Sequence, residues 1–148
     1  MSPTPAIDPA DLAARFRTAI VPLVRALRTN VEEGMTPSLM SALATVSREG
    51  PITLGDLAAV EKVTPPMATK LGNALVERGL ASRTACADDK RVARLELLPE
   101  GRAVLDRSHH RRNAWLAERF ADLDDDERAR LAEAVTVIER LTREAVRS

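Results

Sequence analysis

Short polar side chains and prolines gather on one face of the helix that the segment TPPMATKLGNALVERGL, residues 64–80, is predicted to form. Apolar residues recur at intervals of three and four on the opposite face, as they do on a helix that buries one side. Hydroxyl, amide and ammonium groups on a flat face can hydrogen-bond to base edges and phosphates, and proline and threonine carbons can contact thymine methyl groups. The candidate binding residues on this face are Pro65, Pro66, Thr69, Lys70 and Asn73.

A polar helix face is most often simply solvated, and that alternative stays open at this point. Against it, Lys and Glu are the usual solvent-facing residues, whereas Pro66, Thr69 and Asn73 are short. The net charge of the chain is zero, yet residues 62–94 hold seven Lys and Arg against three Asp and Glu, and residues 118–148 hold six Arg against nine acids. This sorting of charge favours an anionic partner for the middle of the chain.

Catalysis and metal binding find little support in the residue pattern. The sequence has no Gly-rich phosphate loop, no nucleophile elbow and no His-containing triad pattern. His109 and His110 are neighbours, so on a helix they diverge by about 100°, and no His or Cys lies three or four residues away. The single Cys86 excludes an internal disulfide, and neither a histidine nor a dense cationic cluster stands near it to lower its pKa. We therefore expect no enzyme activity, no cofactor and no metal site.

The elements that must position the candidate residues are mostly helices. Only 2% of the residues are aromatic and 45% are hydrophobic, so the core is expected to be built from Leu, Val, Ala and Ile on packed helices. Asp-Pro and Thr-Pro pairs mark helix starts at Asp8, Thr36 and Thr64, and Thr53 with Asp56 forms a capping-box-like pair. Predicted helices cover residues 8–29, 36–49 and 64–78, about two turns from residue 53, residues 99 to past 120, and residues 124–145. Pro22 should kink the first helix or remove one of its backbone hydrogen bonds.

Gly79 is expected to end the helix of residues 64–78, and a two-stranded hairpin is predicted after it. Residues 80–84 and 92–97 alternate apolar and polar side chains, and CADDKR between them has turn-forming aspartates. Ile52 begins a short extended piece, and the helices from Thr53 and Thr64 are joined tightly enough to form a helix-turn-helix. No apolar run approaches the length of a membrane span, and the start of the chain does not have the pattern of an export signal.

These residues together resemble the MarR (multiple antibiotic resistance regulator) family of transcription factors. The resemblance rests on TPSLMSALATVSREGPITLGDLAAVEKVTPPMATKLGNALVERGLASR at residues 36–83, on DDKR at the hairpin tip and on PEGR at residues 99–102. It implies a mostly α fold with a small β-hairpin wing, in which residues 36–97 form a winged helix-turn-helix lobe. It also implies a homodimer held by helices from residues 8–33 and 99–148. Two positions depart from the family pattern: Leu98 stands where Thr is common before the EGR-type helix start, and the first helix lacks the Cys of the family's peroxide sensors.

The resemblance also implies roles for residues outside the predicted recognition helix. Arg91, or Lys90, would enter the minor groove, with Asp89 as the residue that orients it. Arg83 and Arg94 on the strands are expected to contact phosphates.

A ligand cleft of the family's kind would lie between the dimer helices and the lobe. Its candidate lining residues are Phe16, Ile20, Met40 and His110, although core packing explains each of them equally well. Trp115 is most simply a dimer-interface anchor.

The hypothesis is a cytoplasmic, homodimeric transcriptional regulator that binds a pseudo-palindromic DNA operator, as a repressor relieved by a small aromatic or lipophilic molecule or by a stress signal. The rival hypothesis is a protein–protein interaction module in which the hairpin is a docking loop. The zero net charge keeps the rival open. Duplex DNA affinity that falls steeply with salt would separate the two, because only the regulator should show it.

Overall fold

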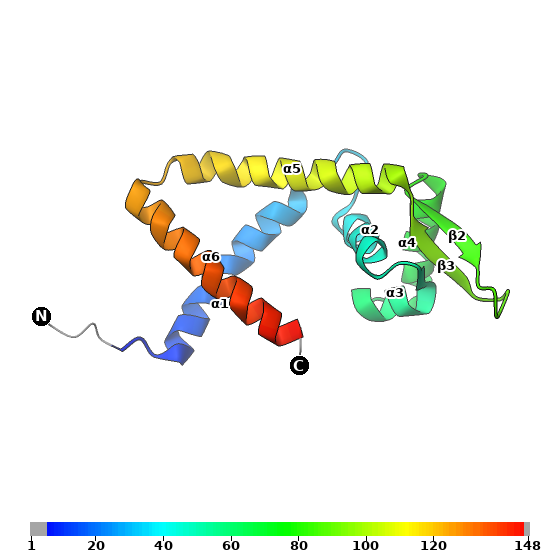
Figure 1. The fold of residues 1–148 in the computed structure, drawn as a ribbon, viewed down its shortest axis with the longest axis horizontal. Helices are drawn as coiled ribbons and strands as arrows, with labels where there is room; N and C mark the ends of the chain where they lie inside the picture. The colour runs from blue at the N-terminus through cyan, green and yellow to red at the C-terminus, as the bar shows by residue number, and fades with distance from the viewer. Residues whose placement is uncertain (1–5, 147–148) are drawn as a thin grey trace, which may run out of the picture. The chain divides into compact units, whose positions relative to one another are not determined.

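The computed structural model describes residues 6–146 of the 148-residue chain. It divides after residue 110 into two compact units, whose described residues are 6–110 and 111–146, and each is described separately. Figure 1 labels the elements in chain order. They are α1 (Pro9–Thr29), α2 (Pro37–Glu49), β1 (Ile52–Thr53), α3 (Leu54–Glu61), α4 (Pro65–Glu77), β2 (Ala81–Ala85), β3 (Ala93–Leu97), α5 (Pro99–Ala121) and α6 (Asp125–Val146).

Most of the predicted helix ends are confirmed by hydrogen bonds. Thr36, Thr53 and Thr64 each accept a hydrogen bond from the backbone N–H three residues on, at 3.1 to 3.4 Å, and so satisfy one of the unpaired donors at a helix start. Gly79, with φ of +70°, follows Arg78, the C-cap residue of α4, and ends the helix as predicted. The prediction for Asp8 is wrong in part, because it occupies the N-cap position of α1 without a capping hydrogen bond from its side chain.

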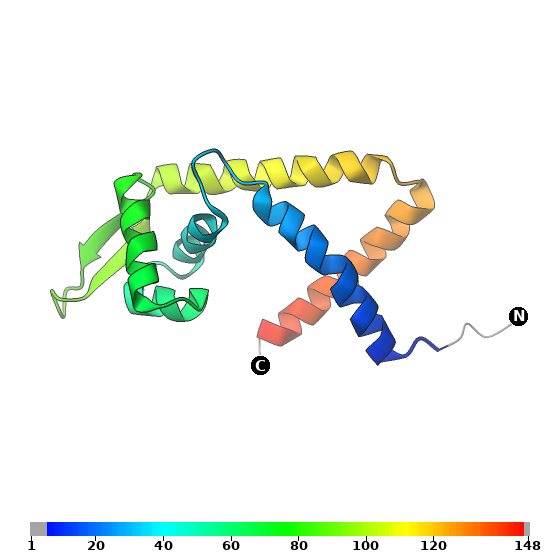
Figure 2. The same ribbon diagram turned by 180° about the vertical axis from the view of Figure 1, so that it is seen from behind.

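The core of the first unit lies in the lobe formed by α2, α3, α4 and the strands. Leu43, Leu57, Leu75 and Leu95 are all fully buried there. Figures 1 and 2 show these helices and the hairpin gathered together, and α4 packs against both α3 and β2. The lobe therefore holds α4 by one face only.

The buried face of α4 differs from its prediction at one residue. Met67 is one of the apolar residues on the face that the sequence spacing predicts to be buried, but it is 42% exposed. Ala68 and Gly72 face the core together with Leu71 and Leu75, which places Met67 at the margin of the buried arc. Ala68 has a small side chain and Gly72 has none, so α4 can approach its neighbours closely, and a Cβ at Gly72 would lie 2.6 Å from Cδ2 of Leu54.

The sheet has three strands in the order β1-β3-β2, all antiparallel. The predicted hairpin is confirmed, with Ala81 opposite Leu97 at its base and Ala85 opposite Ala93 toward its tip. The predicted extended piece at Ile52 is a strand of two residues that pairs with β3, opposite Leu95. Two residues are too few to show the alternation by which a strand is recognised, so the pairing was not foreseen.

Helix α1 runs without interruption from Pro9 to Thr29, with Pro22 inside it. Proline has no N–H, so one backbone hydrogen bond is missing, but the helix does not end there. Although α1 has an apolar stripe, none of its residues is buried. The side chains of Leu12 and Phe16, for example, are about half exposed.

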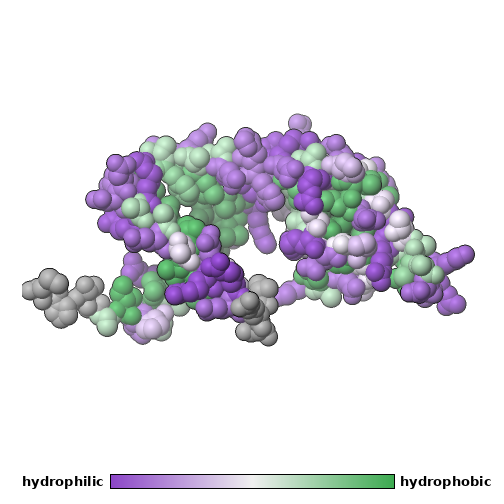
Figure 3. All heavy atoms as spheres, viewed as in Figure 1, coloured by the Kyte–Doolittle hydropathy of each residue, from purple (hydrophilic) through white to green (hydrophobic). Residues whose placement is uncertain are grey.

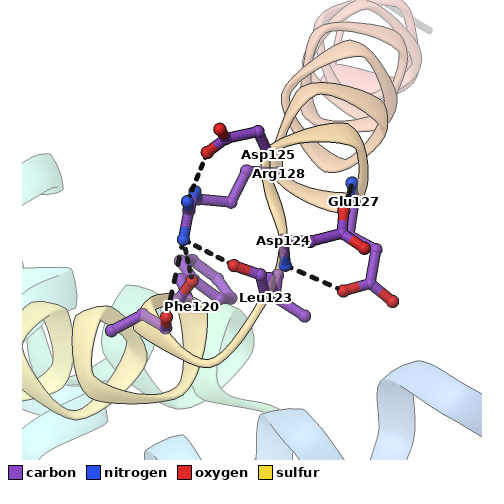
Figure 4. Close-up of polar contacts among 7 residues, drawn as sticks. Phe120, Leu123, Asp124, Asp125, Glu127 and Arg128 are labelled. Carbon is purple, nitrogen blue, oxygen red and sulfur yellow. Dashed lines mark hydrogen bonds and ion pairs between the residues drawn. The ribbon is translucent and has the colours of Figure 1, made fainter.

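The second unit contains the end of α5, the turn after it and α6. Asp124 and Glu127 cap α6 reciprocally, each accepting a hydrogen bond from the other's backbone N–H, at 2.8 and 3.1 Å (Figure 4). Arg128 donates to the backbone oxygen of Leu123 at 2.6 Å and to that of Phe120 at 3.3 Å (Figure 4). The predicted cap at Asp124 is confirmed, and Arg128 ties the start of α6 to the end of α5.

Across residues 6–146, no helix is long and apolar enough to cross a membrane.

Candidate nucleic-acid interface

The outer face of α4 is open to solvent over the whole set of residues predicted for it. The lobe core covers the opposite face, and the Thr64 cap fixes where the helix begins. The exposed residues are Pro65, Pro66, Thr69, Lys70 and Asn73. Because Pro65 and Pro66 occupy the first turn, where a backbone N–H has no helical partner, they cost the helix nothing and give its start an apolar surface.

Two of these side chains already have hydrogen-bond partners within the lobe. The Thr69 hydroxyl donates to the backbone oxygen of Pro65 at 3.0 Å, so towards an outside partner it is an acceptor. Arg83 on β2 donates from Nη2 to Oδ1 of Asn73 at 2.7 Å. A guanidinium has no acceptor, so the atom of Asn73 that faces it must be the oxygen, and the amide nitrogen is left with its two donors. Towards an outside partner, Lys70 and Asn73 are therefore donors.

The tip of the hairpin is exposed and charged, and its backbone is held by Asp89. Oδ1 of Asp89 accepts from the N–H of Arg91 at 3.0 Å, and its backbone oxygen accepts from the N–H of Val92 at the same distance. Asp89 thus shapes the backbone at the tip, and its predicted effect on the Arg91 guanidinium stays a prediction. In Figure 1 the tip projects away from the helices of the lobe, and Figure 3 shows it as hydrophilic.

The two strand arginines lie on different faces of the hairpin. Arg83 is opposite Leu95 and reaches α4, whereas Arg94 is opposite Thr84 on one side and Thr53 on the other. Because side chains alternate along a strand, Arg83 shares its face with Leu95, and Arg94 points to the other face. The structure therefore brings Arg83 together with the face of α4 and leaves Arg94 apart from it.

A buried polar group between α2 and α3 supports the turn into α4, and sequence reasoning missed it. The Thr45 side chain is fully buried and its hydroxyl donates to Oε1 of Glu61 at 2.5 Å. Arg48 donates from Nη2 to the same hydroxyl at 3.2 Å. Glu61 is the last residue of α3, so this group fixes the end of the first helix of the helix-turn-helix. A lone Thr in an apolar helix stripe offers no signal of such a contact.

Cys86 lies just after β2, half-buried at the base of the hairpin tip. The backbone N–H groups of Asp88 and Asp89 hydrogen-bond to its sulfur and lower the pKa of the thiol. The sequence shows no histidine or dense cationic cluster to lower this pKa, and the largest causes are instead these two backbone hydrogen bonds. The cause is backbone geometry in the turn, which is not visible as a charged residue in the sequence.

The four residues predicted to line a ligand cleft do not line one common hollow. Met40 is buried in the lobe core, while Phe16 and His110 are exposed. Ile20 lines a hollow of about 440 Å³ with Val24, Arg28 and Pro37, and the other three predicted residues do not line it. A second hollow of about 490 Å³ has Arg28, Arg48 and Glu61 in its wall, and sequence reasoning did not find it.

His109 and His110 are both exposed, and the described part of the chain has no group of three or more His, Cys, Asp or Glu side chains that could hold a metal ion. In the second unit, Trp115 is half-buried, and the guanidinium of Arg119 stacks 3.4 Å from the centre of its ring. Its predicted role in a dimer interface stays a prediction.

The helix-turn-helix, the paired hairpin after it and the open polar face of α4 define a winged helix-turn-helix of the kind that DNA-binding transcriptional regulators carry. A sequence model of the MarR family matches residues 35–93. The HTH-type transcriptional regulator MT0903.1 of Mycobacterium tuberculosis is 33% identical over 137 residues, which cover 92% of this chain and 96% of that protein. The chain belongs to the MarR family and is a transcriptional regulator. This family is a class of regulators and not of enzymes.

Solved structures agree with this assignment. A putative transcriptional regulator from Pseudomonas aeruginosa superposes with a TM-score of 0.78 at 31% identity, over 90% of this chain and 94% of that one. The MepR F27L mutant of S. aureus, solved bound to an oligodeoxyribonucleotide, superposes with a TM-score of 0.67 over 88% of this chain and 97% of that one. At 16% identity, this second likeness supports the fold alone.

Proposed function

We propose that the chain is a homodimeric repressor that binds a pseudo-palindromic operator in double-stranded DNA. In this proposal α4 enters the major groove, where Lys70 and the amide nitrogen of Asn73 donate to base edges or phosphates. The observation that carries the proposal is the outer face of α4, which is open while its opposite face is fixed in the core. The hydrogen bond from Arg83 to Asn73 supports it, because it sets the direction of the amide in advance.

The hairpin tip is proposed to reach the adjacent minor groove. Lys90 and Arg91 are both exposed there, and Asp89 holds the backbone from which Arg91 extends. A guanidinium is attracted to the negative potential of a narrow minor groove. Arg83 and Arg94 are proposed as phosphate contacts, with stronger support for Arg83 because it lies beside α4.

A second copy of the chain is the proposed partner of the outer helices. Neither α1 nor the described side chains of α6 include a buried residue, yet both helices expose large apolar side chains. Leu12 and Phe16 on α1, and Val135 and Leu141 on α6, are each between 44% and 56% exposed. Apolar helix faces of this extent favour burial against a partner. We propose that residues 8–33 and 99–148 form the dimer and that residues 36–97 form the DNA-binding lobe, so that two copies of α4 lie about one DNA turn, roughly 34 Å, apart.

Regulation by a small aromatic or lipophilic molecule is part of the proposal. Such a molecule would release DNA by binding one dimer geometry better than the other. The proposed location is the cytoplasm, where a regulator of this kind would meet its DNA operator. The rival, a docking module for protein, rests on the zero net charge of the chain alone.

The salt dependence of duplex DNA affinity tests this proposal. A protein that neutralises several phosphates per subunit should lose affinity steeply, by about 10³-fold or more between roughly 50 and 200 mM salt for six or more contacts. Fluorescence anisotropy with a labelled duplex, first of random sequence and then of a sequence that the protein itself selects from a random library, measures it. Affinity that is absent at low salt, or that does not change with salt, would favour the docking module.

A further inference from the structure

Arg78 binds the loop that connects α1 to the lobe. It is the C-cap residue of α4, directly before Gly79, and its side chain is exposed. Its Nη1 donates to the backbone oxygen of Gly34 and lies 3.9 Å from the sulfur of Met35. These partners lie more than forty residues away along the chain. The end of α4 is thus tied to the connection that follows the first helix.

The connection itself, residues 30–36, is held at further points. Val31 and Met35 pack against the lobe core, and Met35 closes a turn by donating its N–H to the backbone oxygen of Glu32 at 3.0 Å. Arg107 on α5 donates from Nε to Oε1 of Glu32 at 2.9 Å and from Nη2 to Oε1 of Glu100 at 3.3 Å. Arg78 and Arg107 therefore reach the same loop, one from α4 and the other from α5.

We propose that Arg78 is a positioning residue for DNA binding, which links the direction of α4 to that of α1 by holding the end of α4 to the loop at Gly34 and Met35. This inference rests on the proposed function, in which α1 belongs to the dimer and α4 lies in the major groove. In such a dimer the lobe can enter two successive grooves only if its orientation relative to the dimer helices is fixed. Arg107, acting on Glu32 in the same loop, has the same effect from α5.

The position of Arg78 separates this role from a direct phosphate contact. Its guanidinium is engaged by a backbone oxygen of its own chain. It also stands at the opposite end of α4 from Pro65 and Pro66, about 20 Å along a helix of 13 residues. A bond at the end of a helix that is otherwise held by one face resists tilting of that helix. Loss of the bond should therefore change where α4 points and leave its contact residues intact.

The test compares operators that differ only in the distance between their half-sites. The probe is the duplex that the wild-type protein selects from a random library, together with versions in which one base pair is added or removed between the half-sites. One base pair rotates a half-site by about 35°, so a rigid dimer should discriminate strongly among the three duplexes. The variants are Arg78→Ala, Arg78→Lys and Arg107→Ala, with Lys70→Ala as the matched loss of one positive charge on the outer face of α4.

For Arg78→Ala we expect affinity for the selected duplex to fall by about tenfold, the scale of one lost hydrogen bond from a charged donor. Affinity for the altered spacings should fall much less, so that discrimination among the three duplexes shrinks. Arg78→Lys keeps a donor and should retain most of the discrimination, and Arg107→Ala should reduce it as Arg78→Ala does. Lys70→Ala should lower affinity for all three duplexes by one factor and reduce the salt slope by about one.

Two results would overturn the inference. One is an Arg78→Ala variant that loses affinity equally for all spacings with a smaller salt slope, which is the signature of a phosphate contact. The other is an Arg78→Ala variant with wild-type affinity and discrimination. Thermal melting by circular dichroism confirms that each variant is folded, and if Arg78→Ala is not, the Arg107→Ala comparison decides in its place. Failure of the wild-type protein to bind duplex DNA would instead refute the proposed function.

Discussion

The chemistry of single residues on α4 depends on which of their atoms are already engaged within the lobe. Asn73 and Arg83 were predicted separately as DNA contacts, and the structure joins them through a hydrogen bond of 2.7 Å. Thr69, predicted as a hydrogen-bonding residue, uses its proton within its own helix. The sequence pattern identifies the side chains that face outward, but which of their donors and acceptors remain free depends on contacts such as the one from Arg83 to Asn73, which joins two elements and follows from no spacing rule.

Cys86 provides a prediction at this scale that depends on pH. Its thiol pKa is lowered by the N–H groups of Asp88 and Asp89, which exist in this geometry only in the folded turn. Alkylation by iodoacetamide should therefore reach half its maximal rate at a lower pH in the native chain than in urea. Cys86 is the single cysteine, so the modified mass reports on it alone.

The same pKa difference has a defined effect on stability. A folded-state pKa below the unfolded value means that the thiolate stabilises the fold above the unfolded-state pKa, and this contribution is lost as pH falls through the folded-state pKa.

Asp88→Asn is the control for the alkylation experiment. It keeps the backbone N–H, so the pH at which alkylation of Cys86 reaches half its maximal rate should stay lowered in the native chain. Equal midpoints in buffer and in urea would contradict the assignment.

At the scale of elements, Gly101 shows why the PEGR motif needs its glycine. Gly101 is buried in the first turn of α5, and a Cβ there would lie 2.2 Å from the backbone oxygen of Leu80 and 2.8 Å from Cδ1 of Leu97. The start of α5 therefore packs directly on the backbone at the base of the hairpin. The motif was recognised from the sequence as a family feature, and the structure supplies its physical cause.

The prediction for this contact is that Gly101→Ala destabilises the chain by about 1–3 kcal/mol, the usual cost of overpacking a close contact. Gly55→Ala in α3 is the matched control, because a Cβ at that helical glycine meets nothing nearer than Oγ1 of Thr53 at 3.9 Å. The control should be neutral or slightly stabilising. Urea unfolding midpoints measure both variants. A Gly101→Ala midpoint equal to that of the wild type would show that the contact is not tight.

How far the elements could be predicted depended on how local their signals are. The Thr-Pro starts at Thr36 and Thr64 and the stop at Gly79 act within one helical turn, and all three are confirmed. The pairing of β1 with β3 and the exposure of Met67 were not predicted, because the first joins residues some forty positions apart and the second depends on how closely Ala68 and Gly72 let α4 pack. Such features follow from packing, which propensity does not determine.

At the scale of the whole molecule, the apolar surfaces of α1 and α6 are not buried within a single chain. Both helices expose large apolar side chains, and the described residues of neither are buried. The reciprocal cap of Asp124 and Glu127 and the contacts of Arg128 give the second unit a fixed turn of its own. The proposed homodimer accounts for these surfaces and, through Arg78 and the loop it binds, for the orientation of α4.

Native mass spectrometry of the chain mixed with its self-selected duplex, about 30 base pairs long, tests this account most directly. The length allows two copies of α4 to enter successive major grooves on one side of the duplex. The account predicts complexes of two chains on one duplex, without a substantial population of one chain on one duplex at equal concentrations. Complexes of a single chain with the duplex, or no complex at low salt, would contradict it.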